Sequence, residues 1–282
     1  MSSVVAPVSH STHVPSLLER IRQLWARRET VRYLVSSQLK AGHRDKILGH
    51  LWNLLDPMLF VAVYFVVFGL LLGQRAPGRT TEFILYLSVG VLAWRFHGTS
   101  ISQAANCVRG NRGLIHEISF PKSVFPVAIC LSRLYDFLWG LVVVALLVLL
   151  LGNGVTPYWL WLPVVLLLQL LFTLGVAFIV AHLGAFFADT VNIVDVVMRL
   201  WFYMSPIFYQ VRGPRAILPE EYLPLYMLNP TACFFEAYRD ALLWGHTPET
   251  GVIVYVAVVS VLVALIGFAL FARGEGSFAK YV

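Results

Sequence analysis

One short stretch of the sequence is similar to a nucleotide-binding loop. Gly73–Thr80 (GQRAPGRT) nearly fits G-x-x-x-x-G-K-[ST], in which backbone N–H groups and a lysine hold the phosphates. That chemistry needs a strand before the loop, whereas here an apolar segment precedes it, Arg79 replaces the lysine, and Pro77 removes one backbone donor. We therefore expect no ATPase site in this chain.

Charged side chains within apolar segments are the second group that could do chemistry. Arg133 and Asp136 stand at i and i+3, and Asp195 and Arg199 at i and i+4, so the members of each pair lie on one helix face and can neutralise each other. Charges inside a membrane are rare and mark either structural pairs or a transport pathway. The spacing predicts structural pairs, and a transport role stays open.

Enzyme and metal-binding patterns are missing from the sequence. The eight histidines are scattered, and the three cysteines, Cys107, Cys130 and Cys233, lack the spacing of metal ligands. No Ser/His/Asp grouping stands out. We therefore expect no catalytic residue and no bound metal or cofactor. The net charge of +6 suits an anionic membrane surface, and no basic patch with interleaved aromatic residues predicts nucleic-acid binding.

The composition indicates which elements must position these residues. The chain of 282 residues is 59% hydrophobic and 13% charged, whereas a soluble domain is about 25% charged. We predict an all-α polytopic membrane protein with six transmembrane helices, because six segments, with their flanks, reach the roughly 17 residues that a span needs. These segments are 57–72, 83–105, 124–151, 157–188, 193–209 and 251–272. The fourth has no charged residue in 32 positions, which predicts tilt or a kink near Gly175.

Segments outside the spans have their own patterns. Residues 1–14 are predicted to be a disordered tail, and 273–282 a cytoplasmic tail. Residues 15–56 are predicted to form N-terminal amphipathic interface helices, beginning at the capping box Ser16–Glu19, although an ordinary packed helix has the same periodicity.

Residues 211–247 are predicted to form a re-entrant helical hairpin between spans five and six. Their apolar run of 14 residues, 222–235, is too short for a full crossing, and two prolines interrupt it. We expect Asn229 to cap the second short helix with Pro230 in its first turn. The charged residues of that helix, Glu236, Arg239 and Asp240, are expected on a different face from its aromatic residues.

Basic residues near the spans predict the orientation. Thirteen lie on the side that carries both ends of the chain and the 106–122 loop, and five lie on the other side. Since cytoplasmic loops carry the excess of Lys and Arg, both termini are predicted to be cytoplasmic.

Three stretches resemble one family of membrane proteins. They are RDKILGHLWNLLDPMLFVAVYFVVFG (44–69), LIHEISFPKSVFP (114–126) and MSPIFYQ (204–210). The first is similar to the corresponding segment of type-2 ABC exporter permeases that export lipid-linked polysaccharides such as O-antigen, cell-wall galactan or teichoic acid. This resemblance implies a bacterial inner-membrane protein that works with a second copy of itself and two nucleotide-binding ATPase subunits, which bind the ATP and Mg²⁺. It also implies a lipid-linked polysaccharide substrate.

The resemblance further implies that the 106–122 loop docks into the ATPase. Asn111 can cap a short helix there, an apolar face can enter the partner's groove, and a proline can stop the helix. A plain surface turn is the alternative. The candidate coupling residues are Asn111, Arg112, Leu114, Ile115, His116, Glu117, Ile118, Phe120 and Pro121.

Aromatic residues are candidates for guiding a polymer, because the C–H face of a sugar ring stacks on an aromatic ring. Packing against lipid or other helices is the alternative for each of them. The candidates are Phe60, Tyr64 and Phe68 in span one, and Phe202, Tyr203, Phe208 and Tyr209 in span five.

Two rival functions stay open at this stage. A type-2 exporter of drugs or lipids would share the spans but would carry a longer segment between spans five and six. A membrane glycosyltransferase would need carboxylates grouped at a membrane boundary, whereas Asp56, Asp136 and Asp189 are isolated from one another. A neighbouring gene for an ATPase would favour export.

Overall fold

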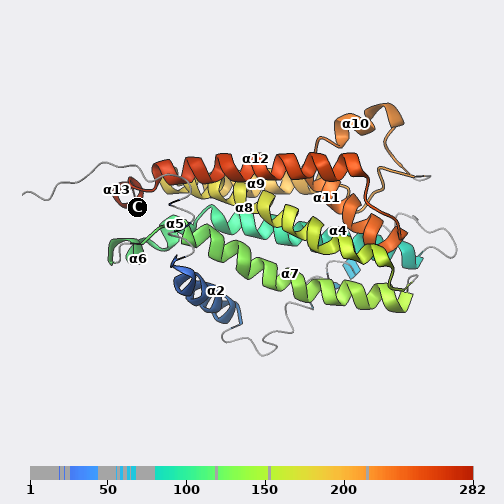
Figure 1. Cartoon of the computed structure of the whole chain (residues 1–282), viewed down its shortest axis with the longest axis horizontal. Helices are drawn as coiled ribbons and strands as arrows, with labels where there is room; N and C mark the ends of the chain where they lie inside the picture. Colours follow the sequence, from blue (N-terminus) through green and yellow to red (C-terminus); the bar gives the residue numbers. More distant parts are fainter. Residues whose placement is uncertain are drawn as a thin grey trace, which may run out of the picture.

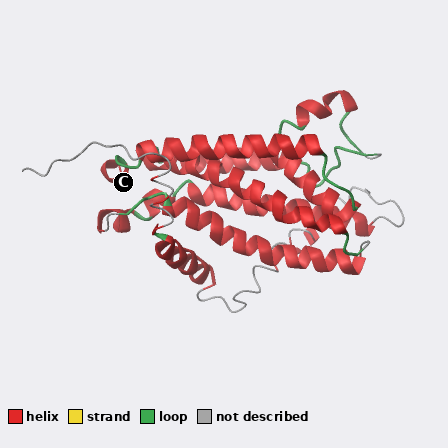
Figure 2. Cartoon of the chain, in the orientation of Figure 1, coloured by secondary structure: helices red, strands yellow, loops and turns green. Residues whose placement is uncertain are grey.

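The computed structural model of this chain describes residues 26–43, 80–117, 120–151, 154–213 and 216–281, with isolated positions before residue 80. Every regular element within these ranges is a helix, and Figure 2 shows no strand among the described residues. The all-α prediction is confirmed for this part of the chain. The predicted tail at 1–14, much of the interface region at 15–56 and most of the first span at 57–72 lie outside the described residues.

Five helices run side by side along the long axis of the bundle (Figure 1). They are α4 (Thr80–Ala104), α7 (Val124–Leu151), α8 (Leu162–Phe186), α9 (Thr190–Tyr203) and α12 (Thr250–Gly274). Three helical segments are long and apolar enough to cross a membrane: Val124–Leu151, Pro157–Phe186 and Thr250–Gly274. The second of these joins the 3-10 helix η3 (Pro157–Trp161) to α8. They correspond to the third, fourth and sixth predicted spans.

α4 and α9 occupy the second and fifth predicted spans and differ from the other three. α4 has 25 residues, and most of its side chains are buried among neighbouring helices. α9 has only 14 residues, which at about 1.5 Å per residue is roughly 21 Å, short of the roughly 30 Å of a bilayer core. The prediction that this helix continues to Tyr209 is wrong. It ends at Tyr203 because Pro206 lacks a backbone donor and disfavours a helical Ser205.

α8 and α12 pack closely through two glycines. A Cβ atom on Gly175 of α8 would lie 2.6 Å from the backbone nitrogen of Ala264 in α12. A Cβ atom on Gly267 would collide with the carbonyl oxygen of Gly175. α8 is a single helix from Leu162 to Phe186, so Gly175 serves a close helix contact where the sequence suggested a kink.

The segment between α9 and α12 has an outer and an inner part. η4 (Glu220–Tyr222) and α10 (Leu223–Tyr226) project from the side of the bundle near one end, next to α12 (Figure 1). α11 (Pro230–Arg239) and the π-helix η5 (Asp240–Trp244) pack into the bundle, and residues 231–242 are all buried. Asn229 caps α11 as predicted, because its side-chain oxygen accepts the N–H of Thr231 at 3.2 Å.

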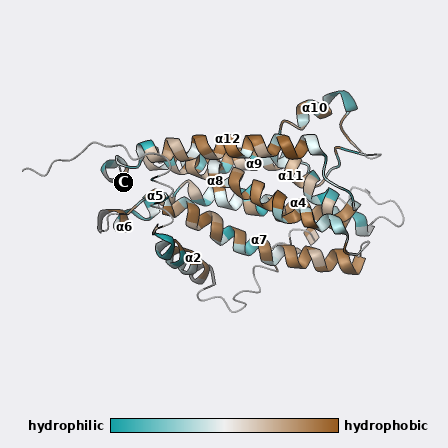
Figure 3. Cartoon of the chain, viewed as in Figure 1, coloured by the Kyte–Doolittle hydropathy of each residue, from teal (hydrophilic) through white to brown (hydrophobic). Residues whose placement is uncertain are grey.

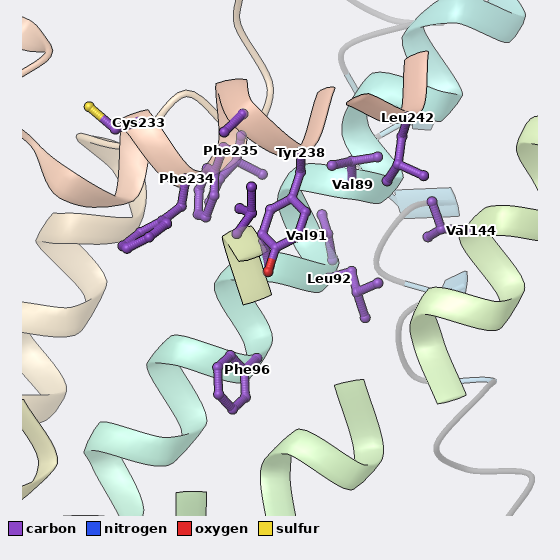
Figure 4. Close-up of a cluster of buried hydrophobic side chains, with 14 of the residues drawn as sticks. Val89, Val91, Leu92, Phe96, Val144, Cys233, Phe234, Phe235, Tyr238 and Leu242 are labelled. Carbon is purple, nitrogen blue, oxygen red and sulfur yellow. The ribbon is translucent and has the colours of Figure 1, made fainter. Parts of the chain in front are cut away.

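α11 belongs to the hydrophobic core of the bundle. Figure 4 shows Phe235 and Tyr238 of α11 beside Val91 and Leu92 of α4, with Val144 of α7 close by. Because α11 is surrounded, its polar face is buried as well. Glu236, Arg239 and Asp240 are 5%, 0% and 7% exposed, so the amphipathic pattern did not reveal their burial.

The two ends of the bundle carry different elements. α5 (Cys107–Gly110), α6 (Arg112–Glu117) and α13 (Phe278–Tyr281) gather at one end, called here the α6 end (Figure 1). α10 lies at the opposite end, called the α10 end. α2 (Arg28–His43) packs against α7 on the flank of the bundle. Figure 3 shows hydrophobic residues along the long helices and hydrophilic residues concentrated toward both ends.

Candidate functional site

A cavity of about 600 Å³ lies between α4 and α9. α4 lines it with Trp94, Arg95 and Thr99, and α9 lines it with polar and aromatic side chains one turn apart. The α9 residues are Asp195, Met198, Arg199, Phe202 and Tyr203. The cavity therefore combines charged groups, a hydroxyl and aromatic rings within an otherwise apolar bundle.

The two predicted charge pairs have different outcomes. Arg133 and Asp136 form an ion pair at 2.7 Å on α7, as predicted. No ion pair joins Asp195 and Arg199, although both are described, so this prediction is wrong. Both side chains are exposed at the cavity, where holding two long side chains together gains little free energy in a high-dielectric environment.

Aromatic rings continue from the cavity to the α10 end. The ring centroids of Trp94 and Phe202 are 5.5 Å apart, and those of Phe202 and Phe208 are 6.1 Å apart. Phe208 lies 5.2 Å from Tyr209, which lies 6.5 Å from Tyr226 of α10. Tyr203 is also in ring contact with Phe202 and Phe208. We call Trp94, Phe202, Tyr203, Phe208, Tyr209 and Tyr226 the aromatic row.

The structure thus brings together the four span-five candidates and adds two rings. Phe202, Tyr203, Phe208 and Tyr209 were predicted, while Trp94 and Tyr226 were missed. Seventeen residues separate Tyr209 from Tyr226, so no helical periodicity could connect them. Phe60, Tyr64 and Phe68, the span-one candidates, lie outside the described residues.

Hydrogen bonds fix the α10 end of the row. The Tyr209 and Tyr226 hydroxyls are 2.9 Å apart, and the Tyr226 hydroxyl donates to the carbonyl of Met204 at 2.8 Å. The Tyr86 hydroxyl donates to the carbonyl of Tyr209 at 2.7 Å. Burial, together with the Tyr209 hydroxyl, raises the pKa of Tyr226, so this ring stays neutral.

Arg239 of α11 holds the irregular 204–209 segment against α4 and α11. Its guanidinium donates to the Glu236 carboxylate at 2.8 Å and to the carbonyls of Tyr86 and Ile207 at 3.3 Å each. It also lies 3.3 Å from the centroid of the Tyr86 ring. Sequence analysis did not assign Arg239 this position, because two of its three acceptors are backbone oxygens of distant segments.

The candidate coupling loop is folded differently from the prediction. Ile115 was expected to enter a partner's groove, but its side chain is 6% exposed and packs inside this chain with Val108 and Phe120. Of the α6 residues whose side chains the structure describes, Arg112 and Gly113 are exposed and Leu114 is half-buried. The side chains of His116 and Glu117, and all of Ile118, lie outside what the structure describes; Pro121 is half-buried.

Two polar side chains fix the first part of this loop, one within the loop and one to α8. Asn111 donates from its amide to the carbonyl of Cys107 at 2.7 Å, so its side chain closes α5 instead of capping α6. Arg109, which sequence analysis missed, donates to the carbonyls of Gly184 at 2.7 Å and Phe186 at 3.2 Å. These carbonyls end α8 without helical partners, and a cation there also suits the helix dipole. Arg109 therefore attaches α5 to the end of α8.

A family model described as "ABC-2 type transporter" matches residues 29–243. The chain belongs to this family. The ABC-2 match covers the cavity, the aromatic row and the 106–122 loop, while α12 and the residues after it lie beyond its bounds.

Three named relatives align with 87% to 94% of this chain. It is 28% identical over 268 residues to an O-antigen export system permease protein RfbA of Myxococcus xanthus, covering 94% of this chain and 100% of the relative. A protein of the same name from Klebsiella pneumoniae is 25% identical, with 88% and 92% covered. The polysialic acid transport protein KpsM of Escherichia coli is 22% identical, with 87% and 93% covered.

Proposed function

We propose that this chain is the permease subunit of an ATP-driven transporter that exports a lipid-linked polysaccharide. The observation that carries the proposal is the aromatic row, which leads from the cavity between α4 and α9 to the α10 end. The relatives are named as O-antigen export permeases and a polysialic acid transport protein, which supports the same substrate class. None of these names points to drug export or to a glycosyltransferase.

The chemistry of the row suits a sliding polymer. A polysaccharide is too long to be enclosed in a pocket, so it must move through weak contacts that repeat along a path. Aromatic faces supply such contacts without a fixed set of hydrogen bonds. Asp195, Arg199 and Thr99 add donors and acceptors for sugar hydroxyls at the cavity.

The exposed face of α9 supports a homodimer around this path. α9 has two exposed sides: the apolar side chains of Ile193, Val197 and Leu200, which are 48% to 61% exposed, form one, and Asp195 and Arg199 lie on the other, at the cavity. Charged groups facing lipid are costly, so such a face is covered by protein or water. A second copy of this chain, placed across a hydrated channel, provides both.

The α6 end provides the surface for the ATPase. Among the α6 residues whose side chains the structure describes, Arg112, Gly113 and Leu114 are accessible, and two nucleotide-binding subunits that hold ATP and Mg²⁺ would dock there. Ile115 is left out of the coupling contact, because its side chain is already covered within the chain.

In this transporter, six spans would cross the bacterial inner membrane, with both termini in the cytoplasm. The 106–122 loop and the last helix lie together at the α6 end, as that orientation requires (Figure 1). The 211–247 segment, with α11 packed inside the bundle, would form the re-entrant hairpin on the other side.

The double variant Tyr203→Ala/Phe208→Ala tests the path. It removes two rings from the aromatic row and leaves the anchoring bonds of Tyr209 and Arg239 in place. We expect polymer export to fall by roughly fivefold or more, because the variant loses two stacking contacts that each contribute about 0.5 kcal/mol or more. Basal ATPase activity and subunit assembly should stay unchanged.

Tyr135→Ala/Trp139→Ala is the matched control. These two rings are exposed and 6.3 Å apart, but they lie on α7, away from the row. Their loss should leave export unchanged. Equal export by the two double variants would show that the row packs and does not guide.

A further inference from the structure

The residues after α12 fold back onto the α6 end, where the sequence predicted only a tail. Phe278 of α13 is 0% exposed, and its ring centroid lies 5.0 Å from that of Phe271 and 5.6 Å from that of Phe186. Tyr281 adds a ring contact with Phe186 at 5.0 Å. The segment 274–281 is therefore packed against the ends of both α8 and α12.

This segment also holds the candidate coupling loop at two points. Phe278 shares one buried cluster with Ile115 of α6 and with Phe120, and α13 contacts α6 directly. At the other end of the loop, the carboxylate of Glu275 accepts the backbone N–H of Lys122. The apolar side of α6 is covered by the chain's own last helix, and its exposed side is left for a partner.

The loop is thereby connected to α8 and α12, the two described helices with the most extensive mutual contact. Arg109 ties its beginning to the end of α8, and Glu275 and Phe278 tie it to the end of α12. α8 and α12 in turn meet through Gly175 and Gly267 without room for a Cβ atom. We therefore expect a displacement of α6 to be passed on to both helices through these packed contacts.

We propose that residues 274–281 form a C-terminal brace that positions the coupling loop and transmits ATPase movement to α8 and α12. Glu275 and Phe278 are its positioning residues. This inference rests on the proposed function, because it takes α6 to be the ATPase contact. The brace and the ATPase contact lie on different sides of α6. The brace packs against its buried side, and the ATPase would bind its exposed side.

The test uses the assembled transporter with its ATPase subunits and measures polymer exported per ATP hydrolysed. Phe278→Ala and Glu275→Ala should each lower this ratio by roughly fivefold, within the range found for contacts along a coupling path, while the ATPase still co-purifies. Glu275→Gln should keep the wild-type ratio, because its amide oxygen still accepts the N–H of Lys122. Phe268→Ala is the matched control: Phe268 packs on Phe178 in the same cluster, away from α6.

Hydrogen exchange provides a second readout on the same variants. The amides of 107–117 should exchange faster in Phe278→Ala than in the wild type, while those in the middle of α8 stay protected. A faster-exchanging loop with an unchanged export ratio would overturn the brace as a transmitting element. If Phe278→Ala fails to assemble, the test is the ratio of polymer exported to ATP hydrolysed in Glu275→Ala compared with Glu275→Gln. A lower ratio in Glu275→Ala alone supports the brace, and equal ratios overturn it.

Leu114→Asp, measured in parallel, separates this inference from the proposed function. Loss of ATPase binding in Leu114→Asp, together with a wild-type ratio in Phe278→Ala and Glu275→Ala, would overturn the brace alone. Unchanged ATPase binding in Leu114→Asp would overturn α6 as the docking site, and with it the basis of the brace.

Discussion

Arg239 shows how a single buried charge can organise a segment that lacks regular structure. Its planar guanidinium reaches a carboxylate, two backbone carbonyls and the face of an aromatic ring at once. Lysine has neither the fork geometry nor the flat face for this set of partners. Because Ile207 is one of the acceptors, the path of the chain between α9 and α10 depends on this residue.

Removing Arg239 should destabilise the protein more than removing an exposed arginine. Arg239→Leu leaves Glu236 buried without its cation, which costs about 3–5 kcal/mol for pairs of this kind. Arg239→Leu/Glu236→Leu should recover part of the loss. The measurement is the temperature at which the detergent-solubilised protein loses its monodisperse peak in size-exclusion chromatography. We expect this temperature to be lowest for Arg239→Leu, intermediate for the double variant and highest for the wild type.

Arg212→Leu is the control for that measurement. Arg212 pairs with Glu249 at 2.9 Å, but the two side chains are 28% and 60% exposed, and such a pair contributes only about 0–1 kcal/mol. If Arg239→Leu and Arg212→Leu lower the midpoint equally, the buried network does not hold the segment.

Among the elements, α8 and α12 make a close backbone contact through two glycines. Neither helix has charged residues along the contact, and helices in lipid gain no hydrophobic free energy by associating with each other. Their association depends on close van der Waals packing, which small residues permit. Gly175 and Gly267 bring the two backbones together at one point.

Gly267→Ala should weaken this crossing. The new methyl group would meet the carbonyl oxygen of Gly175, so the backbones must separate. We expect a lower thermal midpoint and a lower export ratio, because the helices that carry the brace would no longer pack. Gly251→Ala, at the start of the same helix, meets only a flexible side-chain atom at 3.7 Å and should behave as the wild type. Identical midpoints for the two variants would contradict the role of the crossing.

The helices and their ends show which parts of the fold the sequence could predict. α7, α8 and α12 were predictable because long uncharged apolar segments have few alternatives to a membrane helix. The end of α9 was missed because apolar residues continue past Pro206, and the irregular chain is held there by Arg239 and Tyr86 instead of by helical bonds. Ile115 was misassigned for a related reason. An apolar helix face shows that something covers it, but periodicity cannot tell whether the cover is a partner or a distant part of the chain such as Phe278.

At the scale of the whole molecule, the site residues divide between the two ends of the bundle. The aromatic row starts at the cavity and runs toward the α10 end, while the coupling loop and the brace lie at the α6 end (Figure 1). In the proposed transporter, ATP hydrolysis at the α6 end would act on a path that opens toward the α10 end. α9 borders that path. It is also the shortest of the five bundle helices, so the fewest turns of helix pack against its neighbours.

A homodimer predicts that α9 faces its own copy. In a two-fold symmetric interface, residues near the axis lie opposite the same residues of the partner. Single cysteines at Ile193, Val197 and Leu200, on one face of α9, should therefore give cross-linked dimers with short bifunctional maleimides. The native cysteines at 107, 130 and 233 are buried, so the introduced thiol is the reactive one. Val142→Cys and Leu146→Cys provide the control, because these α7 residues are equally exposed but lie on another helix. Cross-linking through α7 with none through α9 would place the dimer interface elsewhere, and the channel between α9 helices would have to be abandoned.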